Sequence, residues 1–196
     1  MSDQLSFIEL DAPPPARLTD RLFYAVFPDA NTAAHIARLA AHLRGEYGLK
    51  GRPLAEDRFH ITLHHLGDYV GEPPRELVAA AHEAASEVTA LPIEVNFDRA
   101  ISFRRSHKAP LVLRGGDGVA QLMAFQQALG ATMMRTGLGN FVQQRFTPHV
   151  TLLYDDHIVP EQAVEIISWT VREFVLVRSL LGQTRHIPLG RWPLLG

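Results

Sequence analysis

The stretch "RFHITLHHL" at residues 58–66 contains a four-residue phrase, "HITL", that returns as "HVTL" within "RFTPHVTLLY" at residues 145–154. Each copy consists of a His, a β-branched residue, a Thr and a Leu. Two such copies are expected by chance with a frequency on the order of one in ten thousand or less, before any allowance for the strand preference of Ile, Val and Thr. Chance therefore does not explain the duplication, which indicates a structural or functional reason.

Strand geometry gives both copies the same meaning. Side chains alternate between the two faces of a strand, so His60 and Thr62 share one face while the residues between and after them point to the other. The same alternation places His149 and Thr151 together. Each motif is therefore predicted to present one imidazole and one hydroxyl side by side, with apolar anchors behind them.

The rest of the chain alternates between strand and helix patterns. We expect helices from about Asn31 to the glycines at 45 and 48, at 73–88 and at 117–137, each with apolar residues spaced for one buried face. We expect strands at 21–27, 58–66, 92–103, 110–115, 145–154, 169–181 and 185–194. Because each His-containing strand follows a long helix, the pattern predicts an α+β protein of two similar lobes, each with its own sheet.

Composition excludes several classes of protein. The formal net charge of −2 argues against a DNA-binding protein held by bulk charge. The absence of cysteine excludes disulfides, thiolate nucleophiles and cysteine-based zinc sites. The apolar runs are far shorter than a membrane span, which takes about 20 residues. We expect residues 1–20, with "DAPPPAR", to form an extended leader before a single domain at 21–196, in a cytoplasmic monomer.

The doubled motif points to acid–base chemistry on a phosphodiester. Two histidines in opposite roles can move protons near neutral pH, one as base and the other as acid. Two threonine hydroxyls can donate hydrogen bonds to the oxygens of an anion. If the two lobes face each other, one imidazole activates water and the other protonates the leaving oxygen.

These residues resemble a known family. Paired H-x-T-x motifs on equivalent strands are the signature of the 2H phosphoesterase superfamily. "RLFYAVFPD" (21–29), both motif strands and the tail "VREFVLVRSLLGQTRHIPLGRWPL" (171–194) look like its bacterial LigT/ThpR branch, the RNA 2′,3′-cyclic phosphodiesterases or 2′-5′ RNA ligases. The similarity runs from about residue 21 to 194.

The resemblance implies a bilobal fold in which two pseudo-symmetric lobes, each an antiparallel sheet backed by helices, enclose an active-site cleft. It implies opening of 2′,3′-cyclic phosphates of RNA ends or small nucleotides to 2′-phosphomonoesters, without metal or cofactor, and 2′-5′ ligation by the reverse reaction. Carried over by position, His60 is the proton donor and His149 the base, while Thr62 and Thr151 hold phosphate oxygens.

One position departs from the family pattern. Many members carry a basic residue, usually Arg, three places after the second motif's Thr, and this chain has Tyr154 there. A phenol donates one hydrogen bond but carries no positive charge at pH 7. We therefore expect Arg58, Arg145 or the basic loop "RRSHKA" (104–109) to supply the charge that a phosphoryl centre needs. Tyr154 itself is kept as a substrate-binding candidate.

Other features leave alternatives open. His60 and His64 have the spacing of a helical metal site, but on a strand they lie about 13 Å apart, so no metal is expected. His64 is expected at the edge of the site or in the core, with His65 pointing the other way.

Aromatic residues lie beside the motifs and either pack in the core or stack on a base; they are Phe59, Phe103, Phe146, Tyr154 and Trp169. Two other functions also remain open: a 2H phosphoesterase acting on another cyclic nucleotide, such as ADP-ribose cyclic phosphate, and a non-catalytic RNA-binding module.

Overall fold

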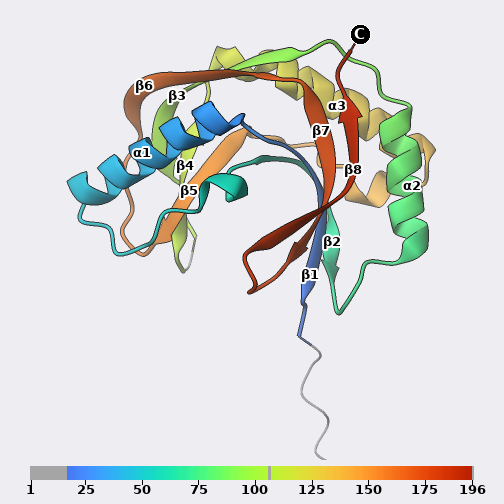
Figure 1. The fold of residues 1–196 in the computed structure, drawn as a ribbon, viewed down its shortest axis with the longest axis horizontal. Helices are drawn as coiled ribbons and strands as arrows, with labels where there is room; N and C mark the ends of the chain where they lie inside the picture. Colours follow the sequence, from blue (N-terminus) through green and yellow to red (C-terminus); the bar gives the residue numbers. More distant parts are fainter. Residues whose placement is uncertain (1–16, 106, 196) are drawn as a thin grey trace, which may run out of the picture.

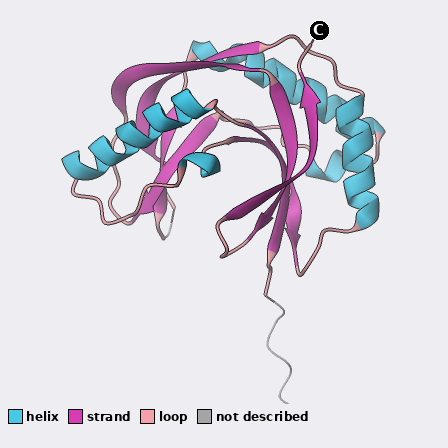
Figure 2. Cartoon of the chain, viewed as in Figure 1, coloured by secondary structure: helices cyan, strands magenta, loops and turns pink. Residues whose placement is uncertain are grey.

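The computed structural model describes residues 17–105 and 107–195. Two four-stranded antiparallel sheets lie side by side, with helices packed against their outer sides (Figures 1 and 2). The predicted α+β class with two sheet-bearing lobes is confirmed. The expected leader at 1–20 falls outside the described residues except for 17–20, and Asp20 already begins the first strand.

The strands are β1 (Asp20–Val26), β2 (Ile61–Tyr69), β3 (Ile93–Ser102), β4 (Ala109–Arg114), β5 (His149–Asp155), β6 (Gln162–Val171), β7 (Glu173–Leu180) and β8 (Arg185–Pro193). The helices are α1 (Ala30–Glu46), α2 (Arg75–Ser86) and α3 (Ala120–Arg135). Single 3₁₀ turns lie at η1 (Glu56–Arg58), η2 (Asp117–Val119) and η3 (Gly139–Phe141).

The two lobes are interleaved along the chain. The first sheet has the strand order β2-β1-β7-β8, and the second has the order β5-β4-β3-β6. The first sheet therefore combines the early and late strands, while the second is built from consecutive strands in the middle of the chain. Because β2 and β5 are the edge strands of their sheets and contact each other, the two motif strands are neighbours.

Helices α1 and α3 each contact the sheet other than the one whose strand precedes them, whereas α2 follows β2 and contacts β8 of the same sheet. Helix α1 follows β1 of the first sheet but packs on β5 and β6 of the second, whereas α3 follows β4 of the second sheet and contacts β2 of the first. Asp29 caps α1, because its carboxylate accepts a hydrogen bond from the N–H of Thr32 at 2.9 Å.

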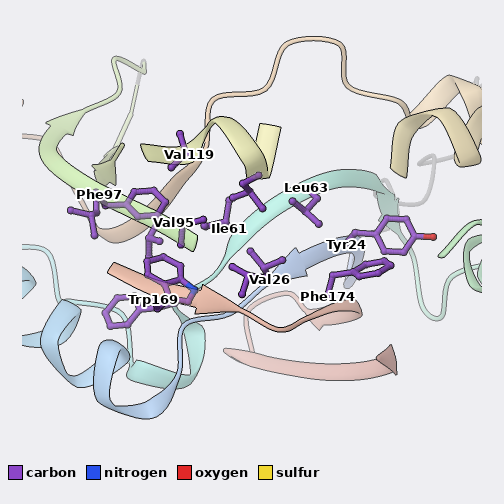
Figure 3. Packing of buried hydrophobic residues seen from close by; sticks show 14 of the residues in the cluster. Tyr24, Val26, Ile61, Leu63, Val95, Phe97, Val119, Trp169 and Phe174 are labelled. Atoms are coloured by element: carbon purple, nitrogen blue, oxygen red, sulfur yellow. The ribbon is translucent and has the colours of Figure 1, made fainter. Parts of the chain in front are cut away.

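Apolar residues of both lobes form one core. In Figure 3, Ile61 lies between a group from the second lobe, with Phe97 and Trp169, and a group from the first lobe, with Tyr24 and Phe174. Phe59 and Trp169 belong to this core, and Phe146 packs against it, so these three aromatic side chains take the core alternative. Both motif strands are thus anchored in the same packed interior.

Three element boundaries differ from the sequence-based expectation. Residues 162–171 form β6, which was not predicted, and Arg172 separates β6 from β7 where one strand was expected at 169–181. Strand β2 begins at Ile61 because η1 occupies the preceding residues, and β5 begins at His149 directly after Pro148, which lacks a backbone N–H for a ladder. Within the described residues, no helix has the length and apolar character needed to span a bilayer.

Candidate active site

The two motif histidines are held in the same way. His60 lies directly before β2 and His149 is the first residue of β5. Nδ1 of His60 lies 2.7 Å from the carbonyl oxygen of Arg58, and Nδ1 of His149 lies 2.7 Å from that of Thr147. Since a carbonyl only accepts, Nδ1 must carry the proton in both rings. Each Nε2 is therefore the nitrogen that exchanges a proton with a ligand.

The threonines share the histidine side of their strands, as predicted. Thr62 pairs with Ala25 of β1 and Thr151 pairs with Val112 of β4, and both threonines are half-buried. The intervening Ile61 and Val150 are fully buried. We call the side of each sheet that carries its His–Thr pair the histidine face.

Burial and nearby positive charges lower the pKa of both motif histidines. Burial lowers the pKa of His60 to about 4. The hydrogen bond to the Arg58 carbonyl acts in the opposite direction, and the positive charges of Arg58, protonated His149 and Arg21 add to the lowering. Burial also lowers the pKa of His149, with a smaller contribution from the charge of Arg105. Both rings are therefore neutral at pH 7 in the ligand-free protein.

A β-bulge follows the Thr in each motif and changes which later residue shares its face. In β2, Thr62 and His64 pair with adjacent residues of β1, so Leu63 is the extra residue. In β5, Thr151 and Leu153 pair with adjacent residues of β4, so Leu152 is extra in the same way. Period-two alternation is thus interrupted at equivalent positions of the two lobes.

The bulges place His65 and Tyr154 on the histidine faces. The expectation that His65 points the other way from His60 is wrong, because the extra residue Leu63 reverses the alternation after Thr62. His64 is instead fully buried: its Nε2–H donates to the Gln126 carbonyl at 2.9 Å and its Nδ1 accepts from the N–H of Gln143 at 3.2 Å. His64 is therefore a core residue, and the third position after each Thr faces the site.

A third histidine lies beside His60. His186 of β8 packs edge-on against His60 with ring centroids 5.1 Å apart, and Phe23 stacks on His60 at 5.1 Å. Nδ1 of His186 is buried without a hydrogen-bond partner among the described residues. Burial, followed by the charges of protonated His60 and Arg58, lowers the pKa of His186 to about 3. Sequence analysis missed His186, because a single His on a strand without a motif gives no signal.

The two arginines predicted to supply positive charge, Arg58 and Arg145, lie in different surroundings. Arg58 is half-buried, and its Nε and Nη1 lack hydrogen-bond partners in the described part of the chain. Burial lowers its pKa, whereas the charges of Asp57 and Tyr154 act in the opposite direction. Arg145 is exposed in the segment before β5, so its predicted place on the strand face is wrong: the strand starts only after Pro148.

Two arginines that sequence analysis did not single out individually also act here. Arg21 of β1 forms a bidentate pair with Asp68, with both N–O distances at 2.7 Å, and the hydrogen bond from Arg21, together with the other interactions of the site, lowers the pKa of Asp68 to about 2. The charge of Arg105, on the predicted basic loop, helps to lower the pKa of His149. The ring of Phe103, directly before this loop, packs edge-on against His149 with centroids 5.0 Å apart. The loop therefore reaches the second motif.

A cavity of about 750 Å³ adjoins the first motif. Phe27, Val175 and Val177 provide apolar walls, and His186 lies at the side nearest His60. Three arginines and three acids also line it, namely Arg172, Arg185, Arg191, Asp29, Asp57 and Glu173. In the described residues, no three His, Cys, Asp or Glu side chains come together in a cluster that could hold a metal ion.

Comparisons with known proteins give matches over most of the chain. A family model described as the 2′-5′ RNA ligase superfamily matches residues 27–183. The RNA 2′,3′-cyclic phosphodiesterase of Escherichia coli (strain K12) is 32% identical over 185 residues, which are 89% of this chain and 96% of that protein.

Two solved structures are similar in fold as well. E. coli LigT in its apo form gives a TM-score of 0.68 at 27% identity, covering 92% of this chain and all of that one. E. coli LigT complexed with 3′-AMP gives 0.64 at 28% identity, covering 91% and 99%. The family match includes both motifs, Arg58 and Tyr154.

Proposed function

The chain belongs to the 2′-5′ RNA ligase superfamily, and from that premise we propose that it opens the 2′,3′-cyclic phosphates of RNA ends or nucleotides to 2′-phosphomonoesters. Membership confirms the resemblance carried by the two motifs. The observation that carries the proposal is the matched pair of imidazoles, each with Nδ1 bound to a carbonyl two residues earlier and Nε2 left for proton transfer. The 3′-AMP complex of E. coli LigT supports a nucleotide ligand.

In the proposed reaction, Thr62 and Thr151 donate hydrogen bonds to the two non-bridging phosphate oxygens. Nε2 of His149 takes a proton from water as the water oxygen forms a bond to phosphorus. The bond between phosphorus and O3′ breaks, and the protonated Nε2 of His60 gives its proton to O3′. The products are a 2′-phosphomonoester and a free 3′ hydroxyl. An RNA 5′ hydroxyl in place of water makes a 2′-5′ bond by the same step.

His60 has to become protonated when the substrate binds. Its pKa of about 4 makes the ring neutral at pH 7 before binding. A phosphate anion within hydrogen-bond reach favours the protonated ring and raises this pKa, which is the direction the donor role requires. His149 needs no such change, because a neutral imidazole is already the base.

Arg58 is proposed to supply the positive charge of the arginine that many family members have at the position of Tyr154. Two buried donors of its guanidinium lack partners among residues 17–105 and 107–195, and its charge acts on both His60 and His186. Unpartnered buried donors are costly in the free protein and become satisfied when phosphate oxygens accept from them. Arg58 thus supplies positive charge from the first lobe instead of the second.

Another 2H activity is the second candidate. Tyr154 departs from the arginine pattern of the family, and the 750 Å³ cavity beside His186 is large enough for a nucleotide-sized group. A substrate such as ADP-ribose cyclic phosphate is therefore included in the same assay. Monomeric state and cytoplasmic location remain predictions from the sequence.

The test is turnover in EDTA. We expect a nucleoside 2′,3′-cyclic phosphate or a cyclic-ended oligonucleotide to yield the 2′-monophosphate, identified by chromatography against 2′ and 3′ standards. His60→Ala and His149→Ala should each lower the rate about 10²–10⁴-fold. A 3′-phosphate product, or a rate that requires added metal, would refute the mechanism. Unchanged rates in both folded variants would mean that these two histidines do not carry the catalysis, whereas no turnover by the wild type would leave a binding module.

A further inference from the structure

Tyr154 occupies a defined place along β5, beyond Thr151. Thr151 pairs with Val112 and Tyr154 pairs with Pro110, so the bulge shortens three residues to two ladder steps, about 7 Å. Two steps also keep Tyr154 on the histidine face. The side chain is 45% exposed, which leaves its ring surface open to a ligand.

Tyr154 lies near the first lobe, because its strand β5 contacts β2. It is close enough to act electrostatically on Arg21 and Arg58, which lie on or beside strands of the first sheet. The same residue lines a cavity of about 470 Å³ with Gly51, Lys50 and Lys108. Tyr154 thus lies between the reacting groups and a second, separate cavity.

Both lysines of the chain line this cavity. They come from two loops on either side of β5, the segment around Gly51 and the basic loop before β4. The two neighbouring carboxylates are engaged by backbone: Asp155 accepts from the N–H of Gly51 at 2.6 Å, and Asp156 accepts from that of Lys108 at 3.2 Å. The two ammonium groups can therefore bind an anion in this cavity.

We propose that this cavity is a binding site for single-stranded RNA: the base next to the cyclic end stacks on Tyr154, and the adjoining phosphate lies between Lys50 and Lys108. An aromatic platform flanked by positive charge is how single strands are held without sequence preference. The inference rests on the proposed function and narrows it, because a cyclic mononucleotide does not reach this site. Tyr154 is then a specificity residue for oligonucleotides, with the phosphate charge left to Arg58.

The experiment compares 2′,3′-cyclic AMP with a hexaadenylate that ends in the same cyclic phosphate. The readout is the ratio of the two kcat/KM values, in EDTA and at several salt concentrations. We expect Tyr154→Ala to lower the ratio of oligonucleotide to mononucleotide about tenfold, the loss of one stacked base. Tyr154→Phe keeps the ring and should keep the ratio, as should Arg75→Ala on the exposed start of α2.

The lysines have their own readout. For the oligonucleotide, the double variant Lys50→Ala with Lys108→Ala should reduce the slope of log kcat/KM against log salt by about 0.7, because one single-strand phosphate contact is lost. Hexaadenylate ending in a 2′-phosphate, which is not turned over, should protect both lysines from acetylation, measured by mass spectrometry. Adenosine 2′-monophosphate should protect them much less.

Several outcomes overturn the proposal. An equal loss on both substrates in Tyr154→Ala would place the phenol at the reacting phosphate, and a Tyr154→Phe variant as poor as Tyr154→Ala would make the hydroxyl the active part. A ratio lost in Arg172→Ala but not in Tyr154→Ala would direct the strand along β7 and β8. If neither substrate is opened, the proposed function fails, and unprotected lysines in the acetylation experiment would still reject the RNA site separately.

Discussion

The low pKa of His60 predicts a specific loss of stability in acid. In the folded protein the ring takes up a proton near pH 4, whereas the unfolded chain does so near 6.5. Between these values the unfolded state binds more protons, so the free energy of unfolding falls as the pH falls. The stability is fully present above about pH 6.5 and is lost progressively down to about pH 4.

The size of this loss follows from the two pKa values. The difference between 6.5 and about 4, at 1.36 kcal/mol for each pH unit, corresponds to on the order of 3 kcal/mol. About 2 kcal/mol of it is lost between pH 7.5 and pH 5 by the same linkage relation. The groups that face His60 are His186, Arg58, His149 and Arg21, and the positive charge of each, when present, opposes protonation of the ring.

The assay is urea unfolding of the wild type and His60→Asn at pH 7.5 and pH 5. The asparagine side chain keeps a donor for the Arg58 carbonyl but does not titrate. We expect the wild type to lose about 2 kcal/mol more than the variant between the two pH values. Equal losses, together with a His60 ring resonance that titrates near 6.5 in NMR spectra, would refute the reasoning.

Three further predictions concern activity and packing. Since both imidazoles have lowered pKa values in the free protein, the pH optimum of kcat/KM should lie below pH 6.5. The optimum of kcat reports the complex with the phosphate substrate and should lie at higher pH. Coincident optima in pH–rate profiles would contradict this. Arg58→Gln should lower kcat about 10²-fold or more on both substrates, whereas a change in KM alone would mean ground-state binding only. Gly51→Ala should lower the urea midpoint by the equivalent of about 2 kcal/mol or more, because a Cβ there would lie 2.1 Å from the Tyr154 carbonyl oxygen. Gly45→Ala in α1, where a Cβ meets nothing within 4 Å, is its control and should not destabilise.

The sequence was sufficient for the parts of the site that follow strand periodicity. His60 with Thr62, and His149 with Thr151, share faces because the members of each pair are two positions apart and no bulge intervenes. The residues after the bulges could not be placed, since an extra residue in a ladder leaves no mark in the hydrophobic pattern: Leu63 and Leu152 look like ordinary core positions.

Contacts between segments far apart in the chain could not be predicted from the sequence either. His186 meets His60 because β8 lies in the sheet of β1 and β2, and a pairing across more than a hundred residues is not encoded in any local pattern. Arg145 shows the opposite error, since the strand was extended through Pro148 to a residue that lies in a loop. Sequence thus located the reacting groups, and the fold supplied their neighbours.

The interleaved sheets impose an order on folding during synthesis. Strands β3 to β6 leave the ribosome together and can pair at once, whereas β1 must wait for β7, with Asp20 opposite Leu180, 160 residues later (180 − 20). Such long-range pairing is slow because a large loop has to close first. Until then, the antiparallel pair of β1 and β2 has His60 but lacks β8, whose His186 packs against it. The first histidine therefore acquires its low pKa, and the enzyme its activity, only when the final two strands have emerged.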